Sequence, residues 1–379
     1  MLKCSGCSAC LNLCPVEAVS LLKNSKGFYS AIIDNDKCIN CGLCKKTCPH
    51  LNTGLASKSA NSKCVLFLCG DYENYISSSS GGAVSTLYKK WAKKGLYFVG
   101  VSYDENTLPF YRISNTESDI EAFKGSKYIQ AHPKNVFKET EKCLMENKKV
   151  LFVGVPCMVS GLRNYLEIKK IQTEKLYTID LICHGVGSPS VWESYLSYLK
   201  KVFKAKVTDY KFRVKQTNNV IAENNTTHHC FMSFENGRNL LDNSIYSHLY
   251  QNIYFKQLIM ADTCYECKYT SLNRISDLSV GDSAKFKPKT NQDSNFAHSS
   301  FLLINTKKGL ELLNILKENG SVINICIDEV HQPHLKAPIN KPKKYDKFWS
   351  TYLKHGFGLC ATIYGGKNII SYIKNRAKK

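Results

Sequence analysis

The chain has 379 residues, 43% of them hydrophobic, so it can bury a large core over two domains and is not a disordered protein. Its start lacks the pattern of a secretory signal, and no run reaches the roughly 18 apolar residues of a membrane helix, so we expect a cytoplasmic protein without a transmembrane segment. The formal net charge of +21 suits an acidic redox protein, an anionic cofactor or a membrane surface. No helix-turn-helix, zinc-finger or stacking-aromatic signature accompanies the charge, so we expect no nucleic-acid partner.

Eighteen cysteines in a reducing compartment predict metal or cluster ligation rather than disulfides. The first eight form two runs of C-x2-C-x2-C-x3-C-P, the second displaced from the first by 34 residues, which indicates an internal duplication. In this motif three closely spaced thiolates bind one 4Fe-4S cubane and the fourth reaches the other. Structural zinc is the alternative, but it usually takes paired C-x2-C units with a spacer. We therefore predict cluster one on Cys4, Cys7, Cys10 and Cys48, and cluster two on Cys38, Cys41, Cys44 and Cys14.

Residues 1–50 are thus expected to form a small bacterial-type ferredoxin domain. Within it we predict a short helix at 16–19, a turn near Lys26-Gly27 and a strand at 30–33. Because the first cysteine is residue 4, little chain is left to cover cluster one, and we expect that cluster to be relatively exposed. Residues 51–63, rich in Ser, Asn, Lys and Ala, are interpreted as a linker.

From residue 64 onward apolar strand-like runs alternate with amphipathic helices, which predicts a larger mixed α/β domain. Two further segments suggest an added antiparallel hairpin, the second of them turning at Glu235-Asn236-Gly237. The expected strands are 65–69, 96–103, 150–155, 177–183 and 300–305, the expected helices are 83–93, 134–147, 190–203 and 307–318, and the hairpin segments are 207–215 and 228–235.

Glycine, cysteine and small residues stand where several of these strands end, and open α/β sheets place ligands at such ends. Ser80-Gly81-Gly82 precedes a helix whose free N–H groups could hold a phosphate or a flavin oxygen, although an ordinary capped loop is the simpler interpretation. Cys157 follows one strand, and Gly161 is expected to open the next helix. Together with Cys183, Cys264 and Cys267, Cys157 supplies the four thiolates that a third 4Fe-4S cluster needs, while core cysteines or zinc remain alternatives.

Four runs of sequence carry a resemblance to a known family. KGSKYIQ (124–130), GVPCMVSGLR, DLICHGVGSPSVW and CYECKYTSLNRISDLSVGD together resemble the coenzyme F420 hydrogenase/dehydrogenase beta-subunit family, over nearly the whole chain. The resemblance implies a flavin domain at 64–340 that binds FAD and its own 4Fe-4S cluster on Cys157, Cys183, Cys264 and Cys267, followed by a basic C-terminal extension at 341–379. It also implies that the flavin lies near Ser80, Gly81, Gly82, Lys127, His184 and Gly185.

Three departures from the pattern of this family lie near the expected cofactor. Met158 stands where glutamine is common, Gly187 where proline is common, and Ser283-Ala284 where an aromatic pair often follows. A different feature, His228-His229, is not expected to bind one ion, because adjacent side chains of a strand point to opposite faces.

The expected function is that of an iron-sulfur flavoprotein oxidoreductase with three 4Fe-4S clusters and FAD. An acidic electron-transfer protein such as ferredoxin, or a larger redox complex, would exchange electrons with it. Lys127 or His184 would stabilise the reduced flavin or relay a proton. Coenzyme F420, a tetrapyrrole or a polysaccharide-pathway intermediate remain candidate small-molecule substrates. The alternatives are a non-catalytic electron-transfer subunit, a reductase of polysaccharide biosynthesis and a zinc-stabilised binding protein.

Overall fold

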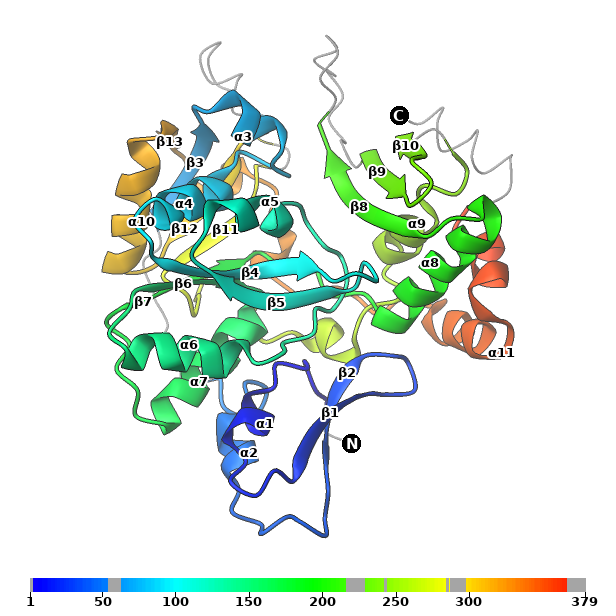
Figure 1. The fold of residues 1–379 in the computed structure, drawn as a ribbon, viewed down its shortest axis with the longest axis horizontal. Helices are drawn as coiled ribbons and strands as arrows, with labels where there is room; N and C mark the ends of the chain where they lie inside the picture. The colour runs from blue at the N-terminus through cyan, green and yellow to red at the C-terminus, as the bar shows by residue number, and fades with distance from the viewer. Residues whose placement is uncertain are drawn as a thin grey trace.

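The computed structural model describes residues 3–53, 63–215, 229–241, 244–283, 286 and 298–366. It has three parts: an amino-terminal module, an α/β body built on one large sheet, and a lobe of helices and a small sheet beside that body (Figure 1). No helix among these residues is both long enough and apolar enough to cross a membrane. The mixed α/β class predicted for the larger domain is confirmed.

The module keeps the internal duplication in its backbone. Gly6 and Asn40, 34 residues apart, have φ of +73° and +53°, and Ser8 and Gly42 repeat the match with +65° and +74°. A two-stranded antiparallel ribbon joins the halves through a turn at residues 24–28, as predicted. The module contains α1 (Ala9–Leu13), β1 (Val19–Lys23), β2 (Tyr29–Ile33) and α2 (Leu43–Thr47).

The helix predicted at 16–19 is wrong. Glu17 adopts a left-handed φ of +51°, which an α-helix cannot contain, and Val19 begins β1 by pairing with Ile33. A β-branched residue fits this half-buried ribbon better than a helix.

The body is organised by an eight-stranded sheet of order β13-β3-β12-β11-β7-β6-β4-β5. Strands β4, β6, β7 and β11 are parallel neighbours, so their carboxyl ends meet at one edge. Strand β3 shares that direction, because β12 is antiparallel to both β3 and β11. The bounds are β3 (Lys63–Cys69), β4 (Tyr97–Tyr103), β5 (Pro109–Ser114), β6 (Val150–Gly154), β7 (Leu176–Leu181), β11 (Leu278–Asp282), β12 (Ser300–Ile304) and β13 (Gly320–Asn324).

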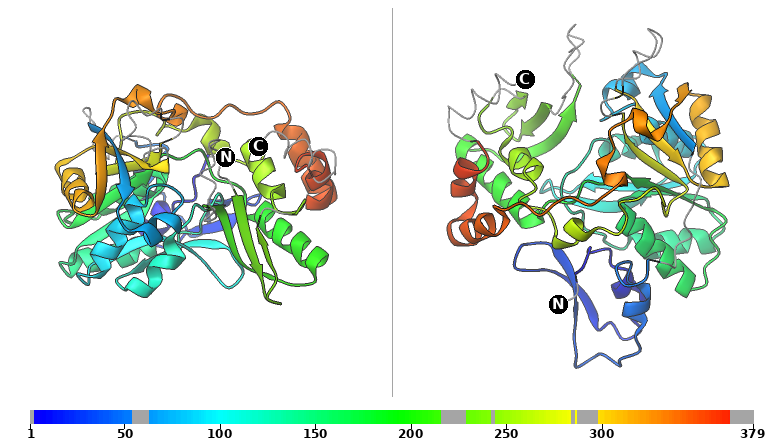
Figure 2. Two further views of the ribbon diagram at one scale, coloured as in Figure 1. Left: turned by 90° about the horizontal axis from the view of Figure 1, so that it is seen from above. Right: turned by 180° about the vertical axis from the view of Figure 1, so that it is seen from behind.

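Helices cover both faces of this sheet (Figure 2). On one face α4, α5 and α10 pack Leu87, Trp91, Phe123 and Leu312 against the strands. The other face carries α6 and α7, and the core there also takes in Cys7 and Ala9 of the module. The helices of the body are α3 (Tyr72–Ile76), α4 (Ala83–Ala92), α5 (Ile120–Phe123), α6 (Val136–Met145), α7 (Pro156–Ile168) and α10 (Lys307–Lys317).

The lobe has an aromatic core centred on Trp192, Tyr195 and Tyr250. The predicted hairpin is confirmed, since β8 and β9 are antiparallel and β9 turns into β10. Helix α11 lies within the expected C-terminal extension and packs Tyr345 and Phe357 into this core. His228 and the tail from residue 367 lie outside the described residues. The lobe contains α8 (Pro189–Phe203), β8 (Val207–Val214), β9 (His229–Phe234), β10 (Asn239–Leu241), α9 (Leu249–Phe255) and α11 (Tyr345–Ile363).

Candidate cluster and cofactor site

The eight cysteines of the module stand at equivalent places in its two halves. Cys10 lies in α1 and Cys44 in α2, and Cys14 and Cys48 directly follow these helices. Backbone amides point at two of the sulfurs: Gly6 and Ala31 donate to Cys4 Sγ at 3.3 and 3.4 Å, and Ala18 donates to Cys14 Sγ at 3.2 Å. Hydrogen bonds of this kind stabilise thiolates and tune the potential of an iron-sulfur cluster.

Burial and neighbouring thiols raise the pKa values of Cys7 and Cys10, two of the cysteines predicted for cluster one. Burial raises the pKa of Cys7 well above its ordinary value, and the neighbours that raise it further are Cys10, Cys4 and Cys48. The pKa of Cys10 rises to about 12, again mainly through burial. Within the described ranges no group of three or more His, Cys, Asp or Glu side chains is arranged to hold a metal ion. A cubane differs from such a site in taking one thiolate at each of four separate irons.

The four cysteines of the third set line one cavity of about 370 Å³ at the carboxyl edge of the sheet. Cys157 lies in the first turn of α7, which begins at Pro156 and not at Gly161 as expected. Cys183 follows β7, and its sulfur accepts a hydrogen bond from the Gly185 amide at 3.3 Å. Cys264 and Cys267 lie in and directly after a short 3-10 helix at Asp262–Glu266.

Burial dominates the acid–base behaviour of these thiols. It raises the pKa of Cys157 well above its ordinary value, and Cys183, Cys267 and then Cys7 raise it further. For the same reason the pKa of Cys183 is about 12 and that of Cys264 about 11. Neighbouring half-buried thiols whose pKa values are raised suit a cationic iron core, which makes its coordinating thiols lose their protons. The donor set therefore fits a 4Fe-4S cluster.

A buried ion pair between Arg274 and Asp180 lies near Cys183 of the third cysteine set. The sequence did not lead us to expect a role for this pair. Arg274 is 2% exposed and Asp180 fully buried, with Nη2 and Oδ1 3.0 Å apart. Arg274 also donates to the Tyr269 carbonyl at 2.6 Å, and its charge counters the burial that raises the pKa of Cys183. The signal in the sequence is the aspartate of strand 176–181, since an acid within an apolar run requires a partner.

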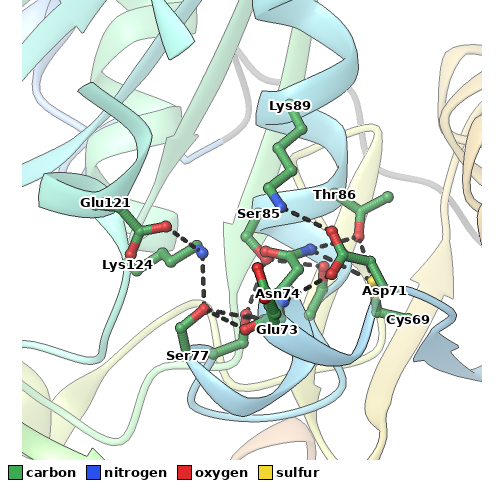
Figure 3. Close-up of polar contacts among 12 residues, drawn as sticks. Cys69, Asp71, Glu73, Asn74, Ser77, Ser85, Thr86, Lys89, Glu121 and Lys124 are labelled. Atoms are coloured by element: carbon green, nitrogen blue, oxygen red, sulfur yellow. Dashed lines mark hydrogen bonds and ion pairs between the residues drawn. The ribbon is translucent and has the colours of Figure 1, made fainter. Parts of the chain in front are cut away.

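The serine-glycine loop between α3 and α4 is held by a polar network (Figure 3). Asn74 Nδ2 donates to Cys69 Sγ at 3.4 Å and to Thr86 Oγ1 at 3.1 Å. Ser78 Oγ donates to the Asn74 carbonyl at 2.6 Å. Gly82, with φ +83°, directly precedes α4 and provides no side-chain cap, and the Ala83 amide donates to Ser300 Oγ at 3.4 Å. The N–H groups at the start of a helix suit an anionic group such as a flavin phosphate, so the loop fits that part of FAD.

The structure brings together five of the six residues expected near a flavin. Ser80, Gly82, Lys127, His184 and Gly185 line the cavity with the third cysteine set. Gly81 instead faces the sheet, where a Cβ would lie 2.2 Å from the Phe67 carbonyl oxygen and 2.3 Å from the Ser300 amide nitrogen. It is therefore explained by close packing of the loop on the strands.

The departures from the family pattern are partly explained by packing. A Cβ on Gly187 would lie 2.2 Å from Tyr250 Oη, so this chain has no room for proline there. Met158 is buried and lines the cavity. Ser283 is buried, while Ala284 lies outside the described residues.

Cationic and imidazole groups surround the same cavity. Burial lowers the pKa of Lys127 to about 8, and its Nζ donates to the Lys124 carbonyl at 2.9 Å. Beside the serine loop, burial lowers the pKa of Lys215 to about 7. The ring of His184 lies 4.0 Å from that of His334. Of these groups Lys127 is mainly protonated at neutral pH, and its charge favours an anionic ligand.

Parts of this chain match family models and known proteins. Residues 147–329 match the family model that describes the C terminus of the coenzyme F420 hydrogenase/dehydrogenase beta subunit, and residues 3–52 match that of the 4Fe-4S dicluster domain. The F subunit of the F(420)H(2) dehydrogenase from Methanosarcina mazei is 25% identical over 189 residues, which are 48% of this chain and 53% of that protein. A chain of the F420-reducing NiFe hydrogenase complex from Methanosarcina barkeri aligns with a TM-score of 0.47 and 17% identity, over 82% of this chain and 92% of its own.

Proposed function

We propose that this chain, which carries a 4Fe-4S dicluster domain and is related over residues 147–329 to the beta subunits of coenzyme F420 hydrogenases and dehydrogenases, is an iron-sulfur flavoprotein oxidoreductase. It passes electrons between three 4Fe-4S clusters and an organic substrate through FAD. The observation that carries the proposal is the shared cavity, in which four cysteines lie together with five of the residues expected near the flavin. Coenzyme F420 is the first substrate to test, because the relative from Methanosarcina mazei is named for its reduced form.

Each of the three clusters and the FAD has a set of residues that would hold it. The module cysteines would hold clusters one and two, and the third cluster would be held by Cys157, Cys183, Cys264 and Cys267. Ser80 and the start of α4 would hold a phosphate of FAD. Bound FAD supplies the exchange between one-electron and two-electron chemistry.

Lys127 and His184 are the proposed acid–base residues. At neutral pH Lys127 is mainly protonated, since its pKa is about 8, and it presents a positive charge to the cavity. A pKa this close to neutrality also lets the ammonium group give up its proton during turnover. The neighbouring His334 has a pKa lowered by burial and then by His331, so a neutral imidazole stands beside His184.

A second candidate function is that of an electron-transfer subunit without its own substrate. It is favoured by apolar side chains exposed on the module, which would suit burial in a larger redox complex. These are Val16, Leu22, Ile32, Ile33 and Ile39.

Turnover by the isolated chain separates the two functions. Protein reconstituted anaerobically with iron, sulfide and FAD should oxidise reduced F420 with a viologen dye as the one-electron acceptor. Cys264→Ala should abolish this activity, whereas Cys326→Ala, an exposed cysteine outside the ligand sets, should retain it. A fully loaded protein that does not turn over reduced F420 would rule out this substrate and favour the electron-transfer role.

A further inference from the structure

The duplicated module allows its two cysteine loops to be compared residue by residue. Both loops follow the same backbone path, with left-handed residues at Gly6 and Asn40 and again at Ser8 and Gly42. A difference in their surroundings therefore does not come from the loops themselves. It comes from what the rest of the chain places against each of them.

Burial separates the middle cysteines of the two loops, because Cys7 is buried and Cys41 is exposed. The outer cysteines of both loops are half-buried, namely Cys4, Cys10, Cys38 and Cys44. Residues 6–9 of the first loop are all buried, and Cys7 is only 6% exposed. In the second loop, residues 39–41 are exposed, with Ile39 at 60%. The expectation that cluster one would be the exposed one is thus wrong. The body covers this loop, because Cys7 and Ala9 pack into the core beside α7.

Gln130 of the body clamps the first loop. Its side chain is buried, and its Nε2 donates to the Ser5 and Tyr29 carbonyls at 2.9 and 3.1 Å. Its Oε1 accepts a hydrogen bond from the Tyr29 amide at 2.7 Å. One side chain thus bonds to the first cysteine loop and to β2 of the ribbon.

Gly161 of α7 provides the close contact on the other side. A Cβ at this position would lie 2.9 Å from Cys7 Sγ and 3.2 Å from Cys7 Cβ, so only glycine lets the loop approach so closely. Helix α7 also carries Cys157, in its first turn. Further along α7, Asn164 Nδ2 donates to the Thr47 carbonyl at 3.2 Å and thereby fixes the residue before Cys48.

We propose that the two cysteine loops of the module have different positions and different roles. Loop 4–10 is an inner site held beside the third cysteine set, and loop 38–44 is an outer site through which electrons enter or leave. The identity of the bound groups rests on the proposed function. Each exchange at the outer site moves one electron between the chain and a one-electron carrier, with no bond or proton changed. Gln130 and Gly161 are positioning residues that keep the inner site away from solvent.

Chelator-driven loss of iron tests this inequality without relying on activity. Fully reconstituted protein is mixed anaerobically with a ferrous-iron chelator, and iron release is followed optically alongside the cluster EPR signals. About four irons should leave in a fast phase, because the outer cluster alone is exposed. Cys41→Ser should remove that phase and leave the slow one. Loss of all irons at a single rate would overturn the inference.

Variants of Gln130 and Gly161 test whether the contacts of these two residues cause the slow release of iron from the inner site. Gln130→Ala loses three hydrogen bonds between body and module, so release from the inner site should accelerate by roughly tenfold. Gly161→Ala should act in the same direction, and Gly358→Ala, a helical glycine whose nearest neighbour is Tyr198 at 4.0 Å, should change nothing. Unchanged slow release in both clamp variants would contradict the proposal. A module that binds far fewer than about eight irons would instead refute the proposed function.

Discussion

The buried ion pair between Arg274 and Asp180, beside the third cysteine set, allows a quantitative test through the free energy of unfolding. Arg274→Met removes the charge that compensates a fully buried carboxylate. Breaking a buried pair on one side typically costs about 3–5 kcal/mol, because the remaining charge is left without a partner. The lost bonds to the Tyr269 carbonyl and to Ser279 Oγ act in the same direction. We therefore expect a destabilisation of about 3–5 kcal/mol.

The measurement is the free energy of unfolding from anaerobic urea titrations at matched iron content. Lys336→Met is the matched control, since Lys336 and Asp328 form a pair whose side chains are 74% and 83% exposed, and it should cost no more than about 1 kcal/mol. The double variant Arg274→Met with Asp180→Leu should recover part of the loss, because no buried charge remains. An Arg274→Met protein as stable as the Lys336→Met control would refute the reasoning.

Three further predictions follow from single residues. Cys157→Ala should lose about four irons, whereas Cys143→Ala, which changes a buried cysteine outside the ligand sets, should lose none; equal iron in both would remove Cys157 from the ligand set. Gly81→Ala should displace the serine loop and weaken FAD binding while the iron content stays constant, and Gly358→Ala should leave the FAD affinity, measured by fluorescence titration, unchanged. The affinity for an anionic ligand such as FAD should fall as pH rises through about 8, since Lys127 then loses its charge; a Lys127→Met protein with the same pH profile would contradict its role.

The motif spacing predicted a grouping of the cysteines that stays a prediction, although the structure places Cys7 near its predicted partners. Three thiolates per half plus one from the other half is a local pattern, and the pKa of Cys7 responds to the predicted partners Cys10, Cys4 and Cys48. The strands and helices predicted between residues 64 and 215 are present in the predicted order, because buried parallel strands are continuous apolar runs bounded by turns. The shorter elements α3, β5 and α5 were not predicted.

Features set by tertiary contact could not be predicted. The burial of Cys7 depends on Gly161, which is more than 150 residues away, and the single-sequence pattern gives no hint of this contact. The strand at Val19 depends on pairing with Ile33. Likewise, Gly81 looks like a ligand-binding glycine in the sequence, and only the approach of β12 shows that it is needed for packing.

The central claim is that twelve of the eighteen cysteines bind three 4Fe-4S clusters beside one flavin. Its most direct test is the iron, acid-labile sulfide, zinc and flavin content of anaerobically reconstituted protein. We predict about twelve irons, about twelve sulfides and one FAD per chain. Stoichiometric zinc without acid-labile sulfide or flavin would contradict the account.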